Sequence, residues 1–227
     1  MLKAKYKTLL MIIFLLLVLS LQVISAQELP LIDTIIMIDP GHGGRDSGTM
    51  YHNILEKDIN LEISKVLETK LSELGAIVYL TRTQDIDLSS IYDSGKKRGD
   101  LYRRLLYIKK KKSDLYLSIH INWYQNSANK GAEVLYNSIN PKNELLATAI
   151  MDEFKVSLNS KREIKTTDLY MYRNTTTPGV LIECGYLSNP EERNLLQNQE
   201  YQEKIATSIS KGVITYLKKH HQLKNIL

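Results

Sequence analysis

The sequence predicts an α/β fold, in which a mixed, mostly parallel twisted sheet of about six strands is covered by helices on both faces. Short apolar runs rich in β-branched residues alternate with longer segments whose apolar residues recur at helical spacing. The chain has 227 residues, 43% of them hydrophobic and 24% charged, which is enough material for one good core. No internal repeat, low-complexity tract or linker divides it.

The first 26 residues differ in composition from the rest. Lys3, Lys5 and Lys7 precede an apolar run over residues 9–19, and Ser25-Ala26 offers small residues for cleavage, a pattern typical of a secretory signal peptide. The run is shorter than the roughly 20 residues that cross a membrane, although weaker apolar positions extend it toward residue 24. We therefore expect residues 1–26 to be a cleaved signal peptide or an N-terminal membrane anchor through residues 9–24, and residues 27–227 to form a single catalytic domain.

Charge is uneven along the chain. Removal of residues 1–26 would lower the formal charge from +5 to +2, but cations crowd residues 96–112, where Asp100 is the only acid. This basic segment is either a solvated helix face or a binding patch for an anionic partner. With one Trp and no nucleic-acid motif, the chain is not expected to bind nucleic acid. Nothing in the sequence demands more than a monomer.

Hydrophobic patterning gives the element order. The expected strands lie near residues 34–39, 76–82, 114–120, 131–136, 167–172 and 179–184. The clearest helix spans residues 57–74, where apolar residues recur at three- and four-residue steps before Gly75. Similar stripes predict helices over residues 98–112, 142–158 and 199–219. Asn189 followed by Pro190 and two glutamates is typical of another helix start.

Three strand ends carry residues suited to catalysis. The first strand breaks at Pro40 and delivers His42 into a glycine-rich loop, while His120 and Glu183 each end a later apolar run. Ligands and reacting groups gather at the carboxyl ends of parallel strands, so these side chains are expected to share one edge of the sheet.

Two histidines and a nearby carboxylate suggest a zinc site. A hydrolytic zinc site has three protein ligands and leaves a fourth position open. His42 and His120 supply nitrogens, and Glu56 is the best third candidate because it stands at the start of the 57–74 helix. Alternatively, Asn53 and Glu56 form a helix-capping pair, and His120 is a satisfied core residue. His52 in a polar turn and His220 and His221 in a basic tail are weaker candidates.

Glu183 is the candidate proton-transferring residue. A carboxylate on a buried strand is costly without a partner, which favours a role as general base; the structural alternative is a salt bridge to Arg82 or Arg173. Cys184 next to it suggests a thiol nucleophile with His120 as base. Neighbouring side chains on a strand point to opposite faces, so we interpret Cys184 as a core residue instead.

Five motifs together resemble the zinc-dependent N-acetylmuramoyl-L-alanine amidases of the Amidase_3 family over most of residues 34–218. The motifs are residues 38–48 (Ile-Asp-Pro-Gly-His-Gly-Gly-Arg-Asp-Ser-Gly), 55–61 (Leu-Glu-Lys-Asp-Ile-Asn-Leu), 81–82 (Thr-Arg), 118–122 (Ser-Ile-His-Ile-Asn) and 182–189 (Ile-Glu-Cys-Gly-Tyr-Leu-Ser-Asn). The resemblance implies that His42, Glu56 and His120 bind zinc and that Glu183 is catalytic.

The chain departs from the family pattern at three positions and loses no ligand there. Trp123 replaces a small residue, Ser47 a proline and Tyr186 a phenylalanine. Trp123 could narrow the cleft or stack on a sugar, which leaves the substrate range open. We expect Asn122, Trp123 and Arg82 to contact substrate.

Length and the absence of wall-binding repeats make the chain most similar to the germination-specific members of this family. The resemblance implies hydrolysis of the amide between N-acetylmuramic acid and L-alanine in spore-cortex peptidoglycan, before muramic-δ-lactam forms. It also implies a location in the cell wall or spore envelope and a spore-envelope lipoprotein as a partner, with the basic segment as one conceivable contact. The alternatives are a zinc peptidase that cuts within the stem peptide and a non-catalytic wall-binding module.

Overall fold

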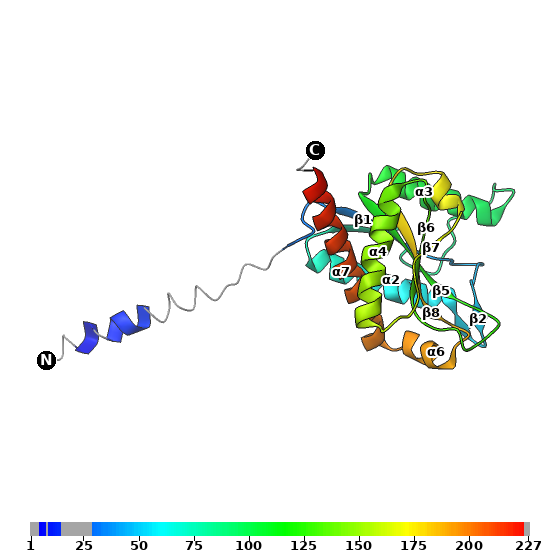
Figure 1. Ribbon diagram of the computed structural model, residues 1–227. Coiled ribbons are helices and arrows are strands. Elements are labelled where there is room, and N and C mark those ends of the chain that lie inside the picture. The colour runs from blue at the N-terminus through cyan, green and yellow to red at the C-terminus, as the bar shows by residue number, and fades with distance from the viewer. Residues whose placement is uncertain (1–4, 8, 15–28, 225–227) are drawn as a thin grey trace.

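A six-stranded sheet forms the centre of the computed structural model, which describes residues 5–7, 9–14 and 29–224 (Figure 1). The strand order is β4-β1-β5-β8-β6-β7. The strands are β4 (Ile77–Leu80), β1 (Ile35–Pro40), β5 (Leu115–Asn122), β8 (Gly179–Tyr186), β6 (Glu133–Tyr136) and β7 (Lys165–Thr166). All neighbours are parallel except β6 and β8. A separate two-stranded ribbon pairs β2 (Met50–Tyr51) with β3 (Ile54–Leu55).

Helices cover both faces of the sheet unequally, which confirms the predicted α/β architecture. The larger layer consists of α2 (Glu56–Glu73), α4 (Pro141–Ser157) and α7 (Gln199–Lys224), and Figure 1 shows α4 beside α7. The other face carries α3 (Lys96–Lys110) and the short α5 (Tyr170–Arg173). The helix α6 (Pro190–Leu196) follows β8, and the Asn189 side chain caps it by accepting bonds from Glu191 N and Glu192 N.

Side-chain alternation along the strands divides the apolar residues between two cores. Ile38, Leu117 and Ile182 belong to the large core beneath α2, α4 and α7, whereas Met37 and Leu181 belong to the small core beneath α3 and α5. Residues two positions further along each strand keep the same face. The ends of β1, β5 and β8 therefore carry polar side chains on the α3 side of the sheet.

Cys184 lies in the large core, fully buried, as its position next to Glu183 predicts. Burial raises the pKa of its thiol far above the usual value, and nearby Glu183 raises it further. The thiol is therefore neutral and inaccessible, so the structure contradicts the alternative of a cysteine nucleophile.

The predicted strand over residues 167–172 is wrong. β7 is shorter and earlier, and its last ladder bond runs from Thr167 N to Tyr136 O. The chain then forms α5, which buries Met171 in the small core. The run of apolar and aromatic residues over 169–172 (Leu-Tyr-Met-Tyr) resembles a strand, but β7 is an edge strand with one neighbour, and packing against α3 favours the helical turn.

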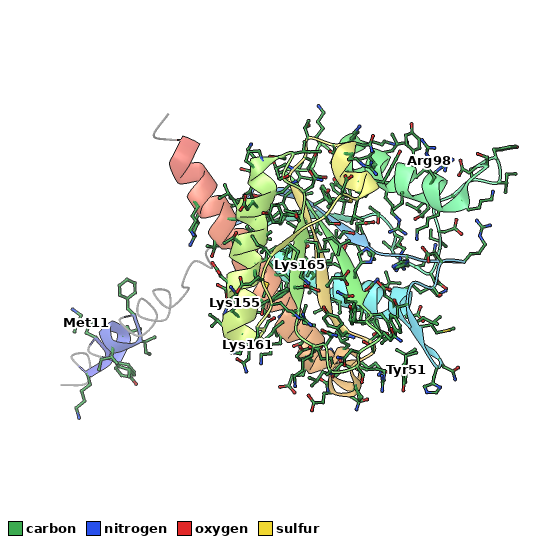
Figure 2. All side chains as sticks on the ribbon, turned by 45° about the vertical axis from the view of Figure 1, so that its right-hand side comes forward. Met11, Tyr51, Arg98, Lys155, Lys161 and Lys165 are labelled. Carbon is green, nitrogen blue, oxygen red and sulfur yellow. The ribbon has the colours of Figure 1, made fainter. Side chains whose placement is uncertain are left out.

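The basic segment forms α3 and proves heterogeneous. Arg104 is buried, Lys96 donates to the carbonyls of Ser90 and Ile91, and other cations face solvent, among them Arg98, which Figure 2 labels on this helix. Most of the segment is thus a solvated helix face, which was the first of the two interpretations of the basic residues.

The predicted signal peptide or anchor over residues 1–26 falls largely outside the described residues and stays a prediction. Within the described part of the chain, no helix combines the length and apolar character needed to cross a membrane.

Candidate metal centre

The loop after β1 presents His42 in an unusual backbone conformation. His42 has φ = 62°, in the left-handed region that side chains other than glycine rarely adopt. Arg104, a buried residue of α3, binds this loop by donating to the carbonyls of Pro40 (2.7 Å) and His42 (2.5 Å). Its guanidinium also pairs with Asp39 (2.8 Å) and Asp100 (2.7 Å). The buried charge is therefore compensated, and the loop conformation is fixed by it.

Arg82 joins the same loop to the start of α2. Its guanidinium donates to the carbonyls of Pro40 (2.9 Å), Gly41 (2.9 Å) and Lys57 (2.7 Å), and its side chain is 2% exposed. Burial and then the charge of Arg104 lower the pKa of Arg82 to about 10, so Arg82 stays charged at neutral pH. The prediction that Arg82 contacts substrate is wrong, because all three of these bonds are to backbone inside the protein.

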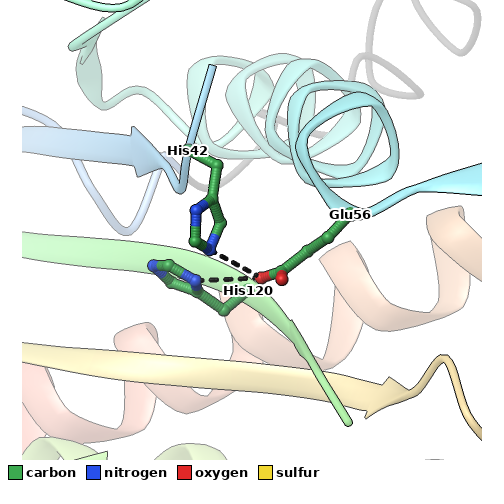
Figure 3. A group of neighbouring side chains, drawn as sticks. All are labelled: His42, Glu56 and His120. Atoms are coloured by element: carbon green, nitrogen blue, oxygen red, sulfur yellow. Dashed lines mark hydrogen bonds and ion pairs between the residues drawn. The ribbon is translucent and has the colours of Figure 1, made fainter. Parts of the chain in front are cut away.

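The structure brings the three predicted metal ligands together (Figure 3). His42 Nε2 lies 3.2 Å and His120 Nδ1 lies 3.1 Å from Glu56 Oε1, and the two imidazole rings are 5.0 Å apart at 80°. Tetrahedral zinc with bonds of roughly 2.0–2.1 Å separates its ligand atoms by about 3.3 Å. The distances from Glu56 to both imidazoles therefore fit a zinc ion.

Two glycines make room for these side chains. A β-carbon at Gly41 would lie 2.3–2.7 Å from three atoms of the His120 ring. At Gly48, where φ is +64°, a β-carbon would lie 2.6 Å from Glu56 Oε2. Both positions require glycine for the ligands to approach one another.

Glu56 is not a helix cap, because α2 begins after Leu55 and shows no side-chain capping bond. Its buried carboxylate instead accepts bonds from Thr49 N (2.7 Å) and Ile121 N (3.2 Å). Burial raises its pKa, but His120 and His42 lower it more, so the net pKa falls far below the usual range. Glu56 is therefore held as the anion that a cationic ligand requires.

Glu183 lines the same opening and lacks a cation partner. Its Oε2 has no hydrogen-bond partner among the described residues. The predicted alternative of a salt bridge is wrong, since Arg82 bonds to backbone and Arg173 pairs with Asp168 (3.2 Å). Burial, then the charges of Glu56 and Glu133, raise the pKa of Glu183 well above its usual value. The carboxyl of Glu183 is therefore biased toward its protonated form.

Glu133 belongs to the site and was not predicted from the sequence. It lies opposite Glu183 in the β6–β8 ladder, is 1% exposed, and accepts bonds from Asn122 Nδ2 (2.8 Å) and the Tyr186 hydroxyl (2.7 Å). Lys165 Nζ lies 2.6 Å from its other oxygen. A charged residue between Ala132 and Val134 in a buried strand was the available signal.

The opening above the triad, here called the metal cleft, measures about 450 Å³. Its lining comprises His42, Asp46, Gly48, Thr49, Glu56, Lys97, His120, Ile121, Asn122, Trp123 and Glu183. Trp123 is 49% exposed and thus free to contact a ligand. Asn122 also lines the cleft, but its amide is engaged with Glu133 and Trp123 N. His52 stacks on Tyr51 outside the cleft, and the side chains of His220 and His221 lie outside the described residues.

Comparison with known proteins agrees with this arrangement. The family profile for N-acetylmuramoyl-L-alanine amidases (Amidase_3) matches residues 36–215. The germination-specific N-acetylmuramoyl-L-alanine amidase of Bacillus subtilis (strain 168) is 41% identical over 194 residues, covering 83% of this chain and 82% of that protein. The CwlD amidase of Clostridioides difficile, solved in complex with the GerS lipoprotein, has 34% identity and a TM-score of 0.78, covering 82% and 99% of the two chains. An N-acetylmuramoyl-L-alanine amidase of Clostridium difficile 630 has 32% identity and a TM-score of 0.72, covering 82% and 97%.

Gly41→Ala is expected to weaken zinc binding by roughly 10- to 100-fold, because the new methyl group displaces the His120 ring. His120→Ala should lower the affinity further by removing a ligand atom. The matched control is Gly95→Ala, whose β-carbon meets only Arg98 Cβ at 3.8 Å. Zinc affinity is measured by competition with a chromophoric chelator, and an unchanged affinity in Gly41→Ala would contradict the assigned ligand set.

Glu183→Gln is expected to stabilise the metal-free protein at neutral pH. The folded pKa of Glu183 is raised, so its contribution to stability is complete below the unfolded pKa of about 4.3 and is lost as pH rises through the folded value. The variant should therefore gain about 1–3 kcal/mol in free energy of unfolding over the native chain as pH rises. Denaturant titrations from about pH 4 to about pH 8 measure the difference in free energy of unfolding. The exposed Glu200→Gln is the control. A constant difference across this range would contradict the raised pKa.

Proposed function

The chain belongs to the N-acetylmuramoyl-L-alanine amidase family and is an amidase acting on peptidoglycan, and we propose that it uses zinc and that its substrate is spore-cortex peptidoglycan. The scissile bond is the amide between N-acetylmuramic acid and L-alanine. Residues 27–227 form the catalytic domain in this proposal, and residues 1–26 direct export.

One observation carries the zinc assignment: two imidazole nitrogens lie 3.2 and 3.1 Å from the same oxygen of a buried, ionised carboxylate. Besides the backbone amides of Thr49 and Ile121, the two imidazoles converge on this carboxylate, which is the arrangement that a shared cation would hold. His42, Glu56 and His120 would hold zinc, and the exposed side toward the metal cleft would leave a position for substrate. Zinc bound there would supply Lewis acidity toward the amide carbonyl and would lower the pKa of a water molecule to ~7.

Glu183 then performs the proton transfer. Its carboxylate accepts a proton from the attacking water and donates it to the amide nitrogen, so that L-alanine departs as an amine and the lactyl group as a carboxylate. The raised pKa favours this role, because it makes the carboxylate a stronger base toward water than an ordinary glutamate. Glu133 accepts hydrogen bonds from Tyr186 and Asn122 and, after burial and Glu56, contributes to the raised pKa of Glu183.

The biological setting is inferred from the relatives. A germination-specific amidase with 41% identity supports action on spore-cortex peptidoglycan, which we assign to the step before muramic-δ-lactam forms. A similar amidase solved with a lipoprotein supports a lipoprotein partner in the spore envelope. Both inferences support a location in the cell wall or spore envelope.

Glu183→Gln should lower turnover by about 10²- to 10⁴-fold, because the amide cannot relay the proton. Zinc affinity should change little, since Glu183 is outside the ligand set. Stem-peptide release from muropeptides measures the rate. Near-normal turnover in a zinc-loaded variant would remove Glu183 from the mechanism.

Digestion of purified cortex sacculi should produce free L-alanine amino termini and unsubstituted lactyl groups. A zinc peptidase acting within the stem would instead leave L-alanine attached to muramic acid, and a wall-binding module would release nothing. Mass spectrometry of the soluble products separates these outcomes. The zinc-stripped protein is the control, and only re-addition of zinc should restore release.

A further inference from the structure

A second cavity adjoins the metal cleft on its α3 side. This side cavity measures about 210 Å³ and has an apolar wall formed by Leu101, Leu169, Met171 and Leu181. The metal cleft and the side cavity share four lining residues, His42, Asp46, Lys97 and His120. A ligand bound at the triad can therefore extend into the side cavity past Lys97.

Lys97 is the cation available to a ligand at this junction. Its side chain is exposed, and within the described residues it makes no ion pair. Arg104 also lines the side cavity, but its guanidinium is already occupied by Asp39 and Asp100. Arg45 and Lys96 line a neighbouring pocket with Lys97, but Arg45 pairs with Asp87 and Lys96 donates to backbone carbonyls. Asp46 also lines the junction, where it lies 2.9 Å from His42 Nδ1.

The substrate has its own charge pattern. Before cleavage the lactyl carboxyl group is an amide and N-acetylated sugars are neutral, so the carboxylates belong to the stem peptide. Trp123 lines the metal cleft but not the side cavity, and its exposed ring offers a face for a sugar. The charged groups of Arg104, Asp39 and Asp100 that line the side cavity are paired with one another, so its apolar wall is the surface it offers to a ligand. The substrate therefore fits best with its peptide in the side cavity, on the α3 side, and its glycan against the exposed Trp123 ring of the metal cleft.

Building on the proposed function, we propose that Lys97 binds the stem-peptide carboxylate nearest the scissile amide, while the side cavity receives the adjoining apolar peptide atoms. Lys97 is then a determinant of substrate preference, selecting stems with a free carboxylate over stems in which it is a carboxamide. An ammonium–carboxylate pair in a partly enclosed site contributes roughly three- to ten-fold in affinity.

The test uses two muramyl peptides that differ only in this carboxylate, which is free in one and a carboxamide in the other. The full-length zinc-loaded chain should show a kcat/KM about three- to ten-fold higher for the peptide with the free carboxylate, because its KM is lower. The preference should shrink at high salt. Lys97→Ala should abolish the preference and Lys97→Arg should keep most of it. Arg98→Ala is the matched control, because Arg98 is the next exposed cation on α3 and lines neither cavity. An unchanged preference in Lys97→Ala, or none in the native chain, overturns the proposal.

Binding separates this proposal from the proposed function. Calorimetric affinities of the two peptides for the Glu183→Gln chain require no turnover, and adding Lys97→Ala should make them equal. If neither peptide is hydrolysed by the native chain but the affinities differ through Lys97, the proposed reaction fails and the carboxylate site stands. If the peptides are hydrolysed but the affinities do not respond to Lys97, only the carboxylate site fails.

Discussion

Two buried guanidinium groups determine the geometry of the metal centre. The carbonyls of residues 40–42 point into the protein, where an unpaired carbonyl costs about 1–3 kcal/mol. Arg104 and Arg82 satisfy these carbonyls, and Arg82 also binds the carbonyl of Lys57, next to Glu56. The left-handed conformation of His42 depends on these bonds. A single hydrogen-bonded network thereby fixes two of the three ligand-bearing segments relative to each other.

The third ligand is placed by the sheet itself. His120 lies opposite Glu183 in the parallel β5–β8 ladder, so strand register delivers a metal ligand and a proton-transferring group to one edge together. Side-chain alternation turns both toward α3, where the core is small, and turns Cys184 into the large core. The smaller helix layer leaves the space that becomes the metal cleft and the side cavity.

Local sequence was sufficient where one chain segment decides the outcome. The periodicity of residues 57–74, the helix start at Asn189 and the alternation at Glu183–Cys184 each have a local cause, and the structure agrees with them. Prediction failed where long-range packing decides. Residues 167–172 contain an apolar and aromatic run typical of a strand, but α5 begins within them at Tyr170. Arg82 resembles a substrate-binding cation but is enclosed by backbone carbonyls. Glu133 became recognisable as a site residue only through its cross-strand neighbour Glu183.

Two carboxylates at one cleft acquire opposite properties from their surroundings. Glu56 has two imidazoles and two backbone amides around it and is held ionised. Burial and the charges of Glu56 and Glu133 raise the pKa of Glu183 more than the charge of Lys165 lowers it, so Glu183 is biased toward its protonated form. Such divergence separates a ligand from a proton carrier within the same few ångströms. Lys97 lines both the metal cleft and the side cavity, whereas Glu183 lines the metal cleft alone. The cation proposed to bind the stem peptide therefore stands at the junction of the two cavities, and the proton carrier stands on the cleft side of that junction.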